Sequence, residues 1–181
     1  MERNMDFLFK DCVSKQFLEP YTNLIAAKLT YEQLKEIKSN NITLLWSSSP
    51  GMVISNFVFP VIEKQVSGHI IAIDNNFIHS KDSQGNKLFD IYDIVALIMH
   101  EIGHIFNKPN RQDFSSDNEF NNHKEYCADI YAISLNTLFF RQCFISLLSK
   151  TSENEIPYID NKQREELKER LRRIANENIE I

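Results

Sequence analysis

The sequence predicts an α+β fold, in which a run of strands is followed by a run of helices. Stretches rich in β-branched and aromatic residues, suited to strands, lie between residues 42 and 74. From Asp90 onward the apolar residues recur at helical spacing. The chain has 181 residues, of which 43% are hydrophobic, and this is enough to bury the core of one domain. We therefore expect a single domain over residues 1–181.

Residues 1–40 are expected to form a helical N-terminal extension. Apolar residues recur at helical spacing between residues 4 and 38, and Pro20 interrupts them, which predicts two helices. The second helix is expected from about Tyr21 to Lys38, with Asn40 at its end.

Three strands are expected next, and they would form a small mixed sheet. The first two cover Ile42–Trp46 and Met52–Phe59, and Pro60 stops the second. The third covers Gly68–Asp74 and directly precedes the helical half of the chain.

Helices are expected in the second half of the chain. Asp90 is a suitable N-cap for a helix rich in isoleucine. After a polar loop, a long helix is expected from about Asn118 or Asn121 to Lys150. The last segment, residues 155–181, is expected to be a charged helical tail.

This tail has a dense mixture of charges. Its basic residues are Lys162, Arg164, Lys168, Arg170, Arg172 and Arg173. They alternate with glutamates at helical spacing, which is typical of a solvated helix face whose charges pair with one another. We therefore assign no binding function to the tail.

Composition and charge argue against several classes of function. The net charge is −5, from 20 basic and 25 acidic residues, so bulk charge gives no reason to expect a nucleic-acid or membrane partner. No apolar run is long enough for a signal peptide or a membrane span. Three scattered cysteines do not make a disulfide framework and suit a reducing compartment. We therefore expect a cytoplasmic protein.

The segment His100-Glu101-Ile102-Gly103-His104 indicates a metal site. Two histidines four residues apart project from one face of a helix, so both imidazoles can bind the same tetrahedral Zn²⁺. Glu101 lies beside the first ligand, where its carboxylate can take a proton from a zinc-activated water. Burying these polar groups in an apolar helix would be unfavourable without a metal or other partners. The predicted cofactor is therefore Zn²⁺.

A third protein ligand is expected from the helix that follows. Glu125 and Asp129 are four residues apart and share a helix face. Glu125 is the predicted third ligand, and Asp129 would accept a hydrogen bond from the non-ligating nitrogen of a zinc-bound histidine. His123, which would give a three-histidine site, and Glu119, which lies nearer the loop, remain alternatives for the third ligand.

The motif His100-Glu-x-x-His104, followed by Glu125-x-x-Ala-Asp129-x-Tyr-Ala, resembles the gluzincin metallopeptidases. It is most similar to the small soluble ImmA/IrrE-type peptidases, and the similarity covers residues 68–133. The resemblance implies a zincin-like fold, in which a small mixed sheet packs on the metal-binding helix and the following long helix supplies the third ligand. Residues 1–40 and the charged tail have no counterpart that we identify in the family.

Residues and resemblance together predict a zinc metalloendopeptidase. Glu101 would act as general base and then as general acid. The expected partner is a peptide or protein substrate, such as a regulatory protein, and the oligomeric state stays open. The alternative is a zincin-fold sensor or protein-interaction module that binds metal without turnover, although such a module has no need of Glu101.

Two features of substrate binding are less sharply predicted. The strand segment Ile70–Asp74 precedes the metal-binding helix and is the candidate edge to which a substrate adds as a strand. The donor that stabilises the oxyanion of the scissile carbonyl is expected among Tyr126, Tyr131, His123 and Arg141, which the sequence does not rank.

Overall fold

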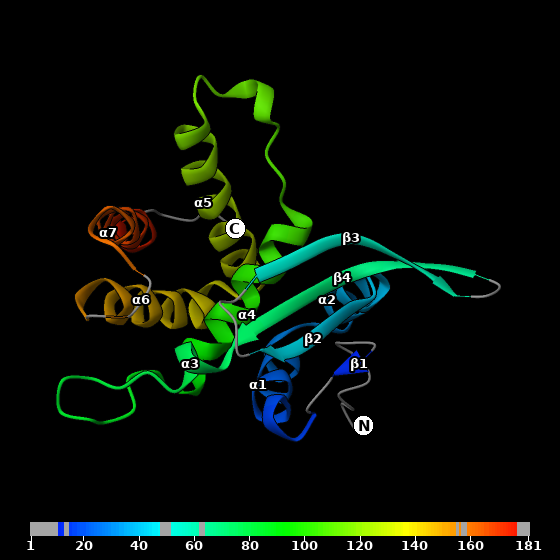
Figure 1. The fold of residues 1–181 in the computed structure, drawn as a ribbon, viewed down its shortest axis with the longest axis horizontal. Helices are drawn as coiled ribbons and strands as arrows, with labels where there is room; N and C mark the ends of the chain where they lie inside the picture. The colour runs from blue at the N-terminus through cyan, green and yellow to red at the C-terminus, as the bar shows by residue number, and fades with distance from the viewer. Residues whose placement is uncertain are drawn as a thin grey trace. The chain divides into compact units, whose positions relative to one another are not determined.

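The structure is a computed structural model that describes residues 11–12, 15–47, 52–61, 64–154, 156 and 159–176. Helices and strands are both present, and helix predominates (Figure 1). The chain divides into two compact units, Met1–Asn76 and Phe77–Ile181, and each is described by itself. The expectation of a single domain stays a prediction. Within the described residues, no helix is both long enough and apolar enough to cross a bilayer.

The first unit contains two helices, but the predicted division between them was wrong. Helix α1 (Lys15–Lys28) runs through Pro20, and α2 (Tyr31–Ser39) begins after Thr30. Pro20 lies near the start of α1, where the loss of one backbone hydrogen bond does not end the helix. Thr30 forms a capping box with the third residue of α2 and so begins a new helix. The expected helix over Tyr21–Lys38 is therefore interrupted.

The first unit contains a four-stranded sheet in the order β1-β2-β4-β3. The strands are β1 (Asp11–Cys12), β2 (Ile42–Ser47), β3 (Met52–Val61) and β4 (Lys64–Asp74). Strand β2 pairs in parallel with β1 and β4, and β3 pairs antiparallel with β4. The three predicted strands are present, whereas β1 is too short to show a sequence period.

Pro60 lies within β3 and does not end it, which corrects the predicted end of that strand. Strand β3 is at the edge of the sheet, where the N–H that proline lacks need not be paired. Helices α1 and α2 and strands β2 and β4 contribute buried apolar residues to the core of the unit. They include Leu18, Ile25, Leu34, Ile37, Ile42, Leu44, Ile71 and Ile73.

The second unit is built of helices. They are α4 (Ile91–Phe106), α5 (Asp117–Leu135), α6 (Thr137–Glu153) and α7 (Asn161–Asn176), with a short turn η2 (Arg111–Asp113); the small helix α3 (Asn75–Ile78) spans the boundary between the units. Helix α4 contacts α5 and α6, and α7 contacts α6 and α5. In Figure 1, α7 runs beside α6.

The predicted long helix that ends near Lys150 is in fact two helices. Asn136 has φ −158° and ψ 87°, so the backbone leaves the helical conformation between α5 and α6. The Asn136 side chain accepts a hydrogen bond from the backbone N–H of Phe139 and caps α6. The prediction was wrong because the apolar residues continue at helical spacing across this break.

Helix α4 begins where it was predicted, and its first turn fastens it to α6. Asp90 is the N-cap and forms a capping box with Asp93. The Asp93 carboxylate is fully buried and accepts hydrogen bonds from Ser146 Oγ at 2.7 Å and from Lys150 Nζ at 2.5 Å. These contacts set the position of α4 and therefore of the metal motif that it carries.

Candidate metal centre

Helices α4 and α5 make their closest approach where Gly103 faces Ala128. A Cβ atom at Gly103 would overlap the Ala128 carbonyl group and would lie 2.8 Å from the Ala128 Cα atom. This approach brings the turn of α5 that carries Glu125 and Asp129 against His100 of α4. Gly103 is therefore required by the packing of the two helices.

Three donor groups converge at this crossing, as predicted: those of His100, His104 and Glu125. His100 Nε2 lies 3.1 Å from His104 Nε2 and 3.1 Å from Glu125 Oε2. His104 Nε2 lies 3.4 Å from Glu125 Oε1. A tetrahedral Zn²⁺ with bonds of about 2.0–2.1 Å holds its ligand atoms about 3.3 Å apart. The three distances therefore match one face of a zinc coordination tetrahedron.

The hydrogen-bond chemistry of this group also favours a cation. Asp129 Oδ1 lies 2.7 Å from His100 Nδ1 and accepts its proton, so Nε2 of a neutral His100 ring carries a lone pair. That lone pair points at a second imidazole nitrogen and at the Glu125 carboxylate, which is an acceptor. A shared cation satisfies all of these atoms at once.

Asp129 is fully buried, and two residues hold its carboxylate. Oδ1 accepts from His100 Nδ1 at 2.7 Å and from Arg170 Nη2 at 2.8 Å, while Oδ2 accepts from Arg170 Nε at 2.8 Å. The two contacts to Arg170 form a bidentate pair. The hydrogen bond predicted between Asp129 and a histidine of the motif is therefore present, together with a cationic partner that was not predicted.

The surrounding charges shift the pKa values of these groups. Burial would raise the pKa of Asp129, but the charges of Arg170 and His100 lower it overall. Burial would also raise the pKa of Glu125, but hydrogen bonds from both histidines hold it well below its usual range. Burial lowers the pKa of His100, yet the charge and hydrogen bond of Asp129 raise it to about 10. Both carboxylates are therefore ionised at neutral pH and His100 is protonated, so a metal ion that binds here would take the place of the proton on His100.

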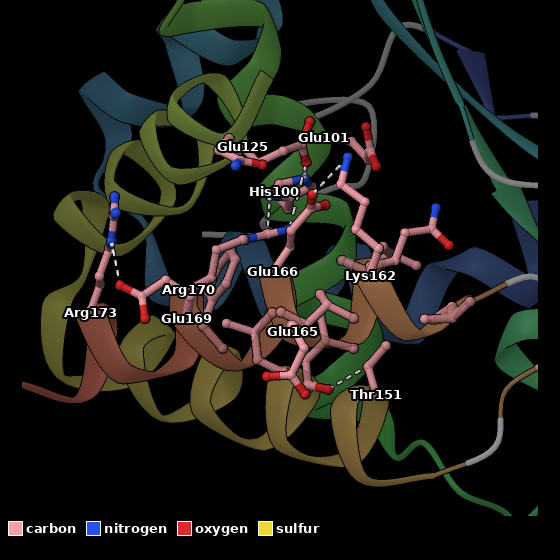
Figure 2. Close-up of a pocket in the computed structure, with 18 of the residues that line it drawn as sticks. His100, Glu101, Glu125, Thr151, Lys162, Glu165, Glu166, Glu169, Arg170 and Arg173 are labelled. Atoms are coloured by element: carbon pink, nitrogen blue, oxygen red, sulfur yellow. Dashed lines mark hydrogen bonds and ion pairs between the residues drawn. The ribbon is translucent and has the colours of Figure 1, made fainter. Parts of the chain in front are cut away.

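Glu101 lines a pocket of about 760 Å³ beside the metal ligands. His100 and Glu125 line the same pocket, and Figure 2 shows these three side chains together at one end of it. Apolar residues of α4, α6 and α7 form other parts of the wall. They are Leu97, Phe144, Leu147, Leu148 and Leu167. The pocket thus combines the metal ligands at one end with a lining in which these apolar residues lie beside charged residues of α7, such as Lys162, Glu166 and Arg170.

The two alternative third ligands lie elsewhere. The His123 ring packs against Phe114, with ring centroids 4.9 Å apart. Glu119 accepts a hydrogen bond from Ser115 Oγ at 2.6 Å near the start of α5. Neither side chain belongs to the converging donor group. The geometry therefore favours Glu125.

None of the four candidate oxyanion donors lines the pocket. Tyr131 stacks on Phe106, and Tyr126 lies 5.4 Å from the guanidinium of Arg173. Arg141 donates to the last backbone carbonyls of α7, and His123 packs as described above. The expected strand Ile70–Asp74 is part of β4 in the other unit, and its role in substrate binding stays a prediction.

Arg170 is the site residue that sequence reasoning missed. The tail that contains it was interpreted as a solvated face, but the Arg170 side chain is only 16% exposed and reaches Asp129. Figure 2 shows Arg170 extending from α7 toward His100 and Glu125. One signal was available: Arg170 lies three residues after Leu167 and four before Ile174, on the apolar side of the helix.

The function of this site is inferred from the arrangement of His100, His104 and Glu125. Comparisons of the chain with protein-family models, with curated proteins and with solved structures gave no significant match.

Proposed function

We propose that the protein is a zinc-dependent metallopeptidase with a zincin-like fold, which hydrolyses peptide bonds in a protein substrate. One observation carries the proposal: His100, His104 and Glu125 converge at distances suited to a tetrahedral metal ion. The resemblance of the two motifs to ImmA/IrrE-type peptidases supports it. The three scattered cysteines support a location in the reducing cytoplasm.

The donor set of two imidazoles and one carboxylate suits a catalytic zinc site with an open fourth position. When bound, Zn²⁺ makes water a nucleophile at neutral pH and polarises the scissile carbonyl. Glu101 follows His100 directly and lines the same pocket, so its carboxylate can take the proton of the attacking water and return it to the leaving amine. Asp129 holds the proton on Nδ1 of His100 and leaves Nε2 for the metal.

A metal-binding module without turnover is the second candidate. The side chains of His100 and His104 are only 9% and 11% exposed, so the group can hold a metal ion whether or not a substrate is turned over there. The two functions differ in their need for Glu101, because only hydrolysis requires a base in the pocket.

The variant Glu101→Gln separates the two functions. For a peptidase it should keep the zinc content of the wild type and lose on the order of 100- to 10,000-fold in the rate of peptide cleavage. Glu165→Gln is the control, because Glu165 lines the same pocket but pairs with Lys168 on the exposed face of α7. Cleavage of a peptide library or of purified candidate proteins gives the rate. Full activity in Glu101→Gln would contradict the mechanism.

A further inference from the structure

We infer that Arg170 is a positioning residue of the metal centre, which acts through Asp129 to hold His100 in its ligating orientation. The inference rests on the metal site of the proposed function and adds the C-terminal helix α7 to that site. Arg170 is not itself a metal ligand, because a guanidinium does not bind a metal cation.

The hydrogen bonds of Asp129 leave its carboxylate one orientation. Arg170 contacts both oxygens through its fork, Nε to Oδ2 and Nη2 to Oδ1, each at 2.8 Å. Oδ1 also accepts from His100 Nδ1 at 2.7 Å. A carboxylate held at only one oxygen can turn about its Cβ–Cγ bond, whereas the fork prevents this. The direction of the bond to His100 is therefore set from α7.

Because Asp129 is buried, the orientation of His100 depends on the hydrogen bonds that hold the Asp129 carboxylate. Asp129 is fully buried, and within the described part of the chain the hydrogen bonds to its carboxylate come from His100 and Arg170. A buried carboxylate that loses its cation must rearrange or find another hydrogen-bond donor. Either change would weaken the hydrogen bond that keeps His100 in place.

Helix α7 has attachments besides Arg170. Ile174 is fully buried, and Arg141 of α6 donates to the carbonyls of Ile174 and Ala175 at 2.9 Å. At the other end of α7, Lys162 Nζ donates to Asn118 Oδ1 of α5 at 3.0 Å. We therefore expect α7 to stay docked when the Arg170 fork is removed, so an effect on the metal can be separated from the loss of the helix.

The test is the affinity for Zn²⁺ itself, measured by competition with a chromophoric chelator. Arg170→Gln should bind Zn²⁺ about 10-fold more weakly than the wild type, which is the usual effect of removing a group that orients a ligand. Arg170→Lys should not restore the affinity, because an ammonium keeps the charge but not the fork. Arg172→Gln is the control on the same helix, since Arg172 is exposed and pairs with Glu169; its affinity should stay within about twofold of the wild type.

A double-mutant cycle tests the route through Asp129. In an Asp129→Asn background, Arg170→Gln should cause a much smaller loss of affinity than in the wild type, and the remainder would come from the 3.6 Å ion pair between Arg170 Nη1 and Glu125 Oε2. Hydrogen exchange of α7 without metal should be the same in Arg170→Gln and wild type. Two affinity results would overturn the inference: binding of Zn²⁺ by Arg170→Gln within twofold of the wild type, or restored affinity in Arg170→Lys. It is also overturned if the full loss of affinity persists in the Asp129→Asn background. Finally, it is overturned if α7 of Arg170→Gln loses its protection from hydrogen exchange. Failure of the wild type to bind Zn²⁺ overturns the proposed function as well, whereas tight binding by both wild type and Arg170→Gln overturns this inference alone.

Discussion

Gly103 of α4 lies directly against the carbonyl group of Ala128 on α5, where a Cβ atom would come within 2.7 Å of the carbonyl carbon. The crossing has no room for a side chain, so the smallest possible substitution is expected to push the helices apart. Since Glu125 and Asp129 flank Ala128 on α5, this displacement would also move the third ligand.

Gly103→Ala should therefore destabilise the protein, although alanine is the better helix former. The intrinsic preference for alanine favours the variant by about 1 kcal/mol, while overpacking at a tight contact costs about 1–3 kcal/mol. We expect a net loss of free energy of unfolding in urea, together with weaker Zn²⁺ binding. Ser134→Ala, on an exposed face of α5, is the control and should change stability by less than about 0.5 kcal/mol. A Gly103→Ala variant more stable than the wild type would show that the helices do not meet this closely.

The contact between Lys150 and Asp93 gives a second prediction. Asp93 is fully buried, while the Lys150 side chain is 30% exposed. Breaking a buried pair costs about 3–5 kcal/mol, and partial exposure reduces this to about 2 kcal/mol. Lys150→Met should lower the free energy of unfolding by this amount. Lys168→Met removes an exposed pair with Glu165 and should cost less than about 1 kcal/mol. Equal effects in the two variants would mean that Asp93 does not depend on Lys150.

Asp90 gives a prediction about pH. Burial would raise its pKa, but hydrogen bonds from Lys150 and from the backbone of the first turn of α4 lower it from 3.8. A carboxyl whose pKa is lower in the folded state stabilises the fold above its unfolded pKa, and this stabilisation disappears as the pH falls through the folded pKa.

Asp90→Asn keeps an N-cap oxygen and removes the charge. It should be less stable than the wild type at neutral pH, and the difference should shrink as the pH falls through the lowered pKa of folded Asp90. Unfolding in urea at several pH values measures this. A difference between the two proteins that does not change with pH would contradict the assigned role of the charge.

The parts of the fold that the sequence predicts are those with local causes. The Asp90 cap and the two histidines of α4 depend on residues within a few positions of one another, and both are where they were expected. Glu125 was predicted because its place on α5 follows from a known motif spacing. The periodicity of apolar residues and the capping of helix ends depend on residues within one or two helical turns. Both can therefore be recognised in a single sequence.

The parts that were missed depend on contacts between distant segments. In the sequence, Arg170 resembles the other basic residues of the tail. Its role becomes visible when α7 docks and places it against Asp129, which lies 41 residues earlier in the chain. The break at Asn136 is also invisible to a periodicity argument, because a side-chain cap can interrupt a helix without changing the apolar pattern.

The central claim is that His100, His104 and Glu125 hold one zinc ion, and zinc content tests it most directly. Wild type, Glu125→Ala and Glu119→Ala should be purified, loaded with Zn²⁺, dialysed and analysed for metal. We predict about one zinc per chain in the wild type and in Glu119→Ala, and far less than one in Glu125→Ala, because loss of a ligand should weaken binding by more than the about 100-fold limit of outer-shell effects. Equal zinc in Glu125→Ala and wild type, or no zinc in the wild type after loading, would contradict the account.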